Sequence, residues 1–251
     1  MKIALLSDIH ANRQALDACL THAYAQGAER LALLGDIVGY GGDPQAVVER
    51  VMELAAGGAI VIQGNHDAMA VSPPVDAETI GELGAQWTHD NLSEAHRDFL
   101  AGLPLHARWG HALFVHASAD HPEQWRYVLD GAAAERSMDA AASMDSAIRY
   151  VFCGHVHQQA LYFVTPTAKL MRFAPQPGVA IPVLPHRQWL AIAGSVGQPR
   201  DGDTRAMYAM FDDEPARLTF HRVPYDFEAA ARAIRATPLP AFFADRLEAG
   251  L

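Results

Sequence analysis

The stretch Gly64-Asn65-His66-Asp67 follows a short apolar run, Ala59–Ile62. A run of this length that ends in a glycine turn predicts a buried strand leaving the core. The polar side chains after it are therefore expected at the carboxyl end of a strand, where open α/β sheets place their ligands. Asn65 offers an amide oxygen, His66 an imidazole and Asp67 a carboxylate. By itself this stretch is only suggestive, so its meaning depends on the other strand ends.

Four other apolar runs end in side chains of the same kind. They are Ile3–Leu6 before Asp8 and His10, Leu31–Leu34 before Asp36, Ala112–Val115 before His116, and Tyr150–Cys153 before His155 and His157. Amphipathic helices are predicted between the first three strands, at about residues 16–24 and 44–55. This alternation of strand and helix is typical of a parallel sheet covered by helices.

The rest of the chain predicts more strands and a few helices. Six short runs between residues 160 and 223, separated by turn residues, predict a largely antiparallel second sheet, and a helix is expected at 226–236. Residues 76–103 are predicted to form a helical excursion from the sheets, close to the polar residues at the strand ends. Trp125 and Tyr127 are expected in the core rather than in a pocket. No linker is evident, so residues 1–251 are interpreted as a single domain, with the apolar tail Leu239–Leu251 packed on it.

Composition excludes several classes of function. The formal net charge of −10 leaves no basic surface to collect nucleic acid, so no stable nucleic-acid binding is expected. No apolar run approaches the ~18 residues of a membrane span, and the first apolar run is too short for a signal peptide. We therefore expect a cytoplasmic protein without membrane contact. Cys19 and Cys153 are expected in the core, since two cysteines make no disulfide framework.

The polar residues at the strand ends predict a metal site. Residues two apart on an extended segment face the same way, so Asp8 with His10, and His155 with His157, can each turn two side chains to one centre. The mixture of carboxylate, imidazole and amide oxygen suits Mn²⁺, Fe, Co²⁺, Ni²⁺ or Zn²⁺ better than Ca²⁺ or Mg²⁺. Each residue alone also fits an ordinary turn. Together, however, they would be costly to bury without a cation.

These blocks resemble the calcineurin-like metallophosphoesterase superfamily. The order and spacing match over residues 8–157, and further stretches resemble its small bacterial and archaeal branch of phosphodiesterases and diadenosine-tetraphosphatase-like hydrolases. Those stretches are residues 35–41, 87–88, 103–104 and 194–201. The resemblance implies a four-layer αββα sandwich, in which two mixed β-sheets are flanked by helices, with the metals at the strand ends.

The resemblance also implies a role for each residue at the site. Two divalent transition metals, Mn²⁺ foremost, would be bound by seven side chains: Asp8, His10 and His157 at the first metal, Asn65, His116 and His155 at the second, and Asp36 as the bridge. A hydroxide held between the metals would attack the phosphoryl group. His66 would assist the leaving group. Asp67 would orient neighbours, or serve only as a turn or N-cap carboxylate.

The implied function is hydrolysis of phosphodiester or nucleotide and dinucleoside polyphosphate linkages in a small phosphorylated or nucleotide substrate. Asn65 and Arg200 are the candidate substrate contacts; Arg200 can bind phosphate in a bidentate manner, or pair with Asp201 or Asp203 instead. One alternative is a phosphomonoesterase, including a protein phosphatase, but Gly39 stands where the protein phosphatases carry an aspartate. Another is a catalytically silent metal-binding scaffold. The substrate, the native metals and the oligomeric state stay open.

Overall fold

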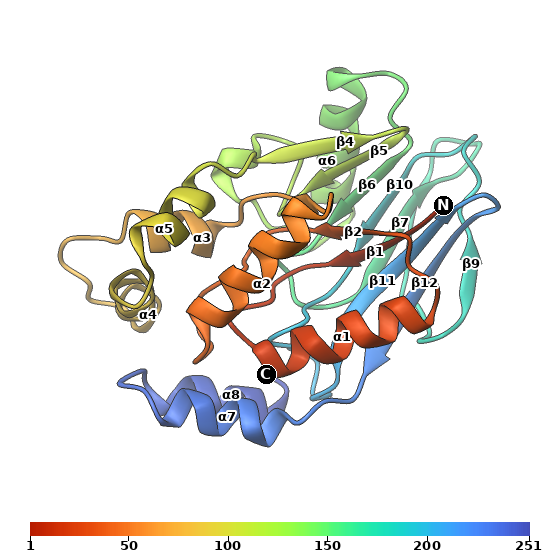
Figure 1. Ribbon diagram of the computed structural model, residues 1–251. Coiled ribbons are helices and arrows are strands. Elements are labelled where there is room, and N and C mark those ends of the chain that lie inside the picture. Colours follow the sequence, from red (N-terminus) through yellow and green to blue (C-terminus); the bar gives the residue numbers. More distant parts are fainter.

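The chain forms two six-stranded β-sheets packed face to face, with helices outside them (Figure 1). The computed structural model describes residues 1–251. The first sheet has the order β3 (Ile60–Val61), β2 (Arg30–Leu33), β1 (Lys2–Leu6), β11 (Ala206–Asp213), β12 (Ala216–Val223) and β9 (Ala180–Pro182). The second has the order β4 (His106–Trp109), β5 (Ala112–Val115), β6 (Tyr150–Cys153), β10 (Trp189–Ile192), β7 (Ala160–Val164) and β8 (Leu170–Phe173).

The helices fall into three groups. Helices α1 (Arg13–Ala25) and α2 (Pro44–Ala56) cover the first sheet, and α6 (Gly131–Met144) covers the second. The expected excursion comprises α4 (Ile80–Asp90) and α5 (Glu94–Ala101), beside the short helix α3 (Asn65–Val71). The chain closes with α7 (Phe227–Arg235) and α8 (Ala241–Ala249), which pack together below the first sheet in Figure 1. None of the helices has the length and apolar character needed to cross a bilayer.

Alternating side chains of the strands build the layers. In β1, Ala4 and Leu6 point into the core beneath α1 and α2, whereas Ile3 and Leu5 point into the core between the sheets. Both faces of these strands are buried, which explains their uninterrupted apolar runs. The result is the four-layer sandwich of two mixed sheets flanked by helices that the sequence predicts.

Three of the later strands do not lie where the sequence suggests. Strands β9, β11 and β12 join the first sheet instead of forming part of an antiparallel second sheet, and β10 pairs in parallel with β6. Strand β11 can lie next to β1 because residues Ala206–Phe211 are buried on both faces, as a central strand requires. The apolar pattern of the sequence predicts that this strand is buried, but it does not predict which strand it pairs with.

The apolar tail packs on its own chain, as expected. Phe243 and Leu247 of α8 form a small core with α7, and Tyr40 and Trp87 pack against this core. Both cysteines are buried and free, which agrees with the sequence-based expectation.

Parallel pairing brings the ends of distant strands together. Strands β1, β2 and β3 pair in parallel, as do β5, β6 and β10 in the other sheet. The carboxyl ends of parallel strands lie at one edge of a sheet, and the two sheets bring these edges side by side. The segments after these strands therefore gather at one end of the sandwich.

Candidate metal centre

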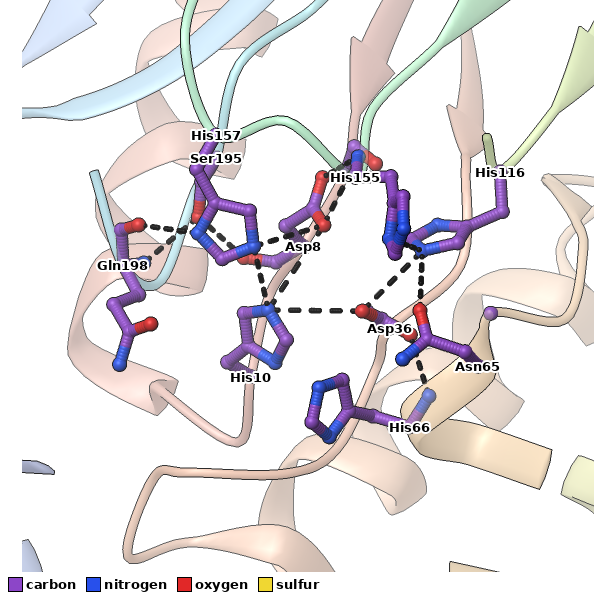
Figure 2. Close-up of polar contacts among 12 residues, drawn as sticks. Asp8, His10, Asp36, Asn65, His66, His116, His155, His157, Ser195 and Gln198 are labelled. Carbon is purple, nitrogen blue, oxygen red and sulfur yellow. Dashed lines mark hydrogen bonds and ion pairs between the residues drawn. The ribbon is translucent and has the colours of Figure 1, made fainter. Parts of the chain in front are cut away.

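Six side chains that follow the parallel strands are buried together at this end of the sandwich (Figure 2). None of them exposes more than the 5% of His155. They form two candidate metal-binding triads, which are Asp8, His10 and His157, and Asp36, His116 and His155. In each triad the possible ligand atoms lie within 4.8 Å of one another.

The first triad joins the segment after β1 to the segment after β6. His157 Nε2 lies 3.0 Å from His10 Nε2 and 3.2 Å from Asp8 Oδ1. The third separation, between His10 Nε2 and Asp8 Oδ1, is 3.9 Å. These three atoms come from two segments that are far apart in the chain, since 147 residues separate His10 from His157.

The second triad lies beside the first. His116 Nε2 is 3.3 Å from Asp36 Oδ2 and 3.1 Å from His155 Nδ1. Asn65 Oδ1 lies 3.1 Å from the same nitrogen, so the amide belongs to this group as well. Asp36 Oδ2 is also 3.8 Å from His10 Nε2, and Figure 2 shows this carboxylate between the two triads.

Backbone carbonyls orient three of the histidines. The Nδ1–H group of His10 donates to Val38 O at 3.1 Å, that of His116 to Leu34 O at 2.7 Å, and that of His157 to Gln198 O at 2.6 Å. The opposite nitrogen, Nε2, then carries a lone pair that points into the site. A hydrogen bond at one ring nitrogen that frees the other for ligation is a common feature of metal-binding histidines.

The electrostatics of the centre also fit cations. Burial is the largest influence on Asp8 and would raise its pKa, but the charge and hydrogen bond of His157 together with the charge of His116 hold this pKa below its usual range. Burial likewise opposes the charged form of His116, yet the carboxylates of Asp36 and Asp8 raise its pKa to about 9. The two carboxylates thus attract positive charge into a buried site. Divalent cations would supply that charge and displace the proton of His116.

The backbone at the centre is strained. Most of the ligand candidates have a positive φ, which is uncommon for residues other than glycine. The values are 53° for Asp8, 50° for His10, 52° for Asp36, 65° for His155 and 61° for His157. Strain of this kind persists only where the surrounding structure imposes it, and it concentrates at functional sites.

Two glycines let the backbone approach the carboxylates. The backbone N–H of His155 donates to Asp8 Oδ2 at 2.9 Å, and that of His66 donates to Asp36 Oδ1 at 2.8 Å. A Cβ on Gly154 would lie 2.3 Å from Asp8 Oδ2, and one on Gly64 would lie 2.2 Å from Asp36 Oδ1. Only glycine fits either position, because a real Cβ never approaches so closely.

His66 lies beside the triads but in neither of them. It stands in the first turn of α3. The stretch Gly64–Asp67 therefore begins a helix and is not an irregular loop. Its ring is 5.1 Å from the ring of His10 and 4.4 Å from that of Tyr40, centroid to centroid. Burial lowers the pKa of His66. A neutral, half-buried imidazole at the edge of the centre can exchange a proton with a bound substrate.

Asp67 binds backbone N–H groups with both of its carboxylate oxygens. Its Oδ1 accepts from Ile37 at 2.8 Å and from Val38 at 3.1 Å, and its Oδ2 accepts from Gly64 at 2.9 Å. Burial and the charge of Asp36 raise its pKa to about 7. These hydrogen bonds tie the start of α3 to the segment that carries Asp36. Asp67 is thus the third residue of α3 and not its N-cap, which is Gly64, and its contacts fit a residue that positions its neighbours.

Arg200 is not paired with an aspartate. Its Nη2 and Nε donate to Gln198 Oε1 at 2.8 and 3.3 Å, and its guanidinium lies 5.7 Å from the centre of the Tyr40 ring. Asp201 instead pairs with Arg222, and Asp203 pairs with Arg205. The ion-pair alternative for Arg200 is therefore wrong, and the side chain lies at the edge of the site.

Two aromatic residues expected in the core lie at the site instead. The Tyr127 ring stacks on His155 with its centroid 3.9 Å away and is 50% exposed. The Trp125 ring meets His116 edge-on at 5.8 Å. The core expectation was wrong because the segment before α6 is irregular, so periodicity gave no facing direction. We call Tyr40, Trp125, Tyr127 and Arg200 the rim residues.

Sequence reasoning missed one rim residue, Tyr40. The only signal was its place between Gly39 and Gly41 in a stretch that resembles the superfamily. Its φ of 63° is the kind of local feature that composition does not reveal. Gln198, which accepts the hydrogen bond of His157 and fixes Arg200, was also part of a resembling stretch without a role assigned to it.

The sequence and the fold both match known proteins. Residues 1–214 match the calcineurin-like phosphoesterase superfamily domain. An uncharacterized protein of Methanocaldococcus jannaschii is 31% identical over 99% of this chain and 98% of its own length. A metallophosphoesterase from Sphaerobacter thermophilus has a similar structure, with a TM-score of 0.87, 33% identity and coverage of 100% of this chain and 99% of that chain.

A hypothetical protein from Pyrococcus horikoshii shares the fold, with a TM-score of 0.78 at 19% identity over 100% of this chain and 98% of its own. The superfamily match covers both triads, His66 and all rim residues. The chain therefore belongs to the calcineurin-like phosphoesterase superfamily and is a metal-dependent phosphoester hydrolase.

Proposed function

We propose that the protein uses two divalent metals to hydrolyse phosphodiester bonds or nucleotide and dinucleoside polyphosphate linkages in small substrates. The observation that carries this proposal is the position of Asp36. Its Oδ2 lies 3.3 Å from His116 Nε2 in one triad and 3.8 Å from His10 Nε2 in the other. One carboxylate can thus serve both triads, which is the arrangement that two-metal hydrolysis requires.

The residues divide into two ligand sets around this carboxylate. Asp8, His10 and His157 would bind one metal, Asn65, His116 and His155 the other, and Asp36 both. The imidazole-rich donors favour Mn²⁺ or a neighbouring transition metal over Mg²⁺ or Ca²⁺. When bound, the metals would polarise the phosphoryl group and activate the attacking water.

The remaining residues act on the substrate. His66 would donate a proton to the departing oxygen, a role supported by its place outside both triads and against His10. The guanidinium of Arg200 would bind a phosphoryl oxygen, and Asn65 would contact the same group from the opposite side. Asp67 would act indirectly, because it ties the start of α3 to the Asp36 segment.

A specific observation disfavours the protein phosphatases. Gly39 has a φ of +92°, and a Cβ there would lie 2.8 Å from His66 Nδ1. The aspartate that those enzymes carry at this position, paired with the catalytic histidine, has no room here. A small phosphodiester or polyphosphate is accordingly preferred to a phosphoprotein. The complete set of candidate ligands also argues against a silent scaffold.

A substrate panel tests the proposal. Protein stripped of metal and resupplied with Mn²⁺ is assayed with bis-p-nitrophenyl phosphate, p-nitrophenyl phosphate, diadenosine tetraphosphate and a phosphopeptide. We expect turnover that depends on metal and is fastest on a diester or a polyphosphate. Fastest turnover on the phosphopeptide would contradict the preference, and no turnover by protein that holds two metals would contradict the enzymatic assignment.

A further inference from the structure

No hydrogen bond orients the His66 imidazole. The backbone N–H of His66 donates to Asp36 Oδ1 at 2.8 Å, but neither ring nitrogen hydrogen-bonds another residue (Figure 2). The rings of His10, His116 and His157 differ, because a backbone carbonyl accepts a hydrogen bond from each of them. A proton donor works only when it is held close to the atom that it protonates. Packing must therefore supply the orientation that hydrogen bonds give to the ligand candidates.

The Tyr40 ring is the closest aromatic neighbour of His66. The centroids of the two rings are 4.4 Å apart, and the ring planes are inclined at 58°. His10 completes the cluster, because its ring lies 5.1 Å from the ring of His66 and 4.7 Å from that of Tyr40. The backbone of Gly39 also lies close to the imidazole, since a Cβ there would be 2.8 Å from Nδ1 of His66. His66 thus packs on one ligand candidate, His10, and on one ring that belongs to neither triad, Tyr40.

Tyr40 is fixed by its own backbone and by α8. Its φ of 63° lies in the left-handed region, which is costly for a bulky residue and persists only where the surroundings impose it. The next residue, Gly41, packs so closely on the first ligand segment that a Cβ there would lie 2.1 Å from the carbonyl oxygen of His10. On α8, the ring of Phe243 lies 5.2 Å from the Tyr40 ring. The ring against which His66 packs is therefore held in one place.

The Tyr40 ring also contacts Arg200. The centre of the guanidinium lies 5.7 Å from the ring centre, within the distance of a cation–π interaction. The Arg200 side chain has a second contact, because it donates to Gln198 Oε1 at 2.8 Å. Loss of the Tyr40 ring would therefore leave Arg200 with its contact to Gln198. His66 would lose its closest neighbour and has no hydrogen bond at its ring to compensate.

We propose that Tyr40 is a positioning residue, whose ring holds the His66 imidazole toward the oxygen of the leaving group. The inference rests on the proposed function, since it concerns the residue that donates the proton there. The ring is responsible rather than the hydroxyl group, because the contacts with His66, His10 and Phe243 are all contacts between rings. Tyr40 should therefore matter most for substrates whose leaving group needs a proton.

Two substrates that differ only in the leaving group test this role. Mn²⁺-loaded protein is assayed by steady-state kinetics with methyl phenyl phosphate, which releases the more basic phenolate, and with methyl p-nitrophenyl phosphate. With phenolate we expect Tyr40→Ala to lower kcat by about 10- to 100-fold, because misplacement of a catalytic group by about 1 Å can cost about 10²-fold. With p-nitrophenolate the loss should stay below about fivefold. Tyr40→Phe keeps the ring and should retain most of the activity with both substrates.

A double mutant shows whether Tyr40 acts through His66. When two residues act as a unit, removal of the second costs little once the first is gone. Tyr40→Ala should therefore cause a loss below about twofold in protein that already carries His66→Ala. Independent losses that multiply in the double mutant would overturn the inference. A loss in Tyr40→Phe as large as that in Tyr40→Ala would also overturn it, as would a rise in KM alone, which would assign the ring to substrate binding.

Two further variants distinguish positioning from a general structural effect. Tyr40→Asn removes the ring but keeps the backbone, because asparagine adopts the left-handed conformation more readily than most residues. It should reproduce the leaving-group dependence of Tyr40→Ala with unchanged metal content, and equal losses with both substrates would contradict positioning. Tyr24→Ala is the matched control, because it removes a tyrosine that is 49% exposed on α1. It should behave as wild type with both substrates.

The outcomes separate this inference from the proposed function. A His66→Ala protein with equal losses for both leaving groups would contradict proton donation by His66, and with it the positioning of a donor. A loss in His66→Ala that depends on the leaving group, but that Tyr40→Ala does not reproduce, would retain the proposed function and contradict positioning by Tyr40. The same dependence in both variants would support both.

Discussion

The two triads and the rim residues are neighbours, but they are held in place differently. The triad side chains are almost wholly buried, stand on strained backbone and are oriented by backbone carbonyls. The three aromatic rim residues contact the same histidines, and all four rim residues remain half-buried or, as with Tyr127, half-exposed. A rigid centre suits chemistry common to all substrates, whereas a more open rim suits discrimination among them. Changes at the centre should therefore reduce every reaction, and changes at the rim should reduce some more than others.

The largest effect is expected from Asp36→Asn at the junction of the triads. The amide keeps the shape but removes the charge shared by His10 and His116. Metal-ion catalysis is worth several kcal/mol, so we expect turnover to fall by about 10³- to 10⁴-fold on every substrate. Steady-state kinetics and the metal content of the purified protein measure the change.

The control for Asp36→Asn is Asp17→Asn, a change of the same kind at an exposed carboxylate of α1. It should leave both metal content and turnover at wild-type values. Full turnover by the Asp36→Asn protein would remove the distinction between centre and rim, because it would show that the shared carboxylate is dispensable.

The next effect is expected from His66→Ala, at the border between the two regions. A proton donor contributes about 10²- to 10³-fold, and least where the leaving group is already a weak base. We therefore expect a large loss of kcat with an alkyl leaving group and a smaller loss with p-nitrophenolate. The metal content should not change, because His66 belongs to neither triad.

His111→Ala is the matched control for His66→Ala, since His111 is exposed in the turn between β4 and β5. It should behave as wild type with both leaving groups. Equal losses with both leaving groups in the His66→Ala protein would argue for a positioning role and against proton donation.

Gly154→Ala tests how rigid the centre is. The added Cβ would lie 1.8 Å from Ser7 Oγ and 2.3 Å from Asp8 Oδ2, so a strand end must move. We expect a loss of about 2–3 kcal/mol in the free energy of unfolding, as for other overpacked sites. Urea denaturation measures it. Gly81→Ala is the control, because a Cβ there meets nothing within 4 Å and alanine favours the α4 helix. A Gly154→Ala protein as stable as Gly81→Ala would show that the centre is compliant.

The centre could be read from the sequence because each of its residues follows an apolar run. Asp8, Asp36 and His116 all come directly after strands whose ends a parallel sheet brings together. The apolar pattern and the topology then suffice to place these residues at one edge of each sheet. The backbone conformation and its carbonyl groups orient the side chains. The four-layer arrangement followed from the resemblance to the superfamily.

The rim could not be read in the same way. Tyr127 lies in an irregular segment, and Tyr40 lies in a glycine-rich turn that is placed by tertiary packing against Phe243 of α8. At neither position does the local sequence pattern predict where the side chain points. The assignment of β11 to the first sheet failed for the same reason, because strand partners are chosen by long-range contacts.

The smallest effect is expected from Tyr127→Ala on the rim. The ring covers His155 with one face and leaves half of its surface in solvent, so it can contact a substrate without binding a metal. An aromatic contact is worth about 1 kcal/mol, and we expect kcat/KM to fall by about three- to tenfold for a nucleotide substrate. For a small substrate without a base the change should be less than about twofold. Kinetics with diadenosine tetraphosphate and with bis-methyl phosphate compare the two cases.

Tyr24→Ala provides the control for Tyr127→Ala, because Tyr24 is 49% exposed, close to the 50% of Tyr127, and lies in the last turn of α1, whose first turn is the end next to His10. It should change neither value. A Tyr127→Ala protein that loses the same factor on both substrates would place Tyr127 with the centre, as a support for His155. A loss confined to the nucleotide would place it on the discriminating rim, together with Arg200.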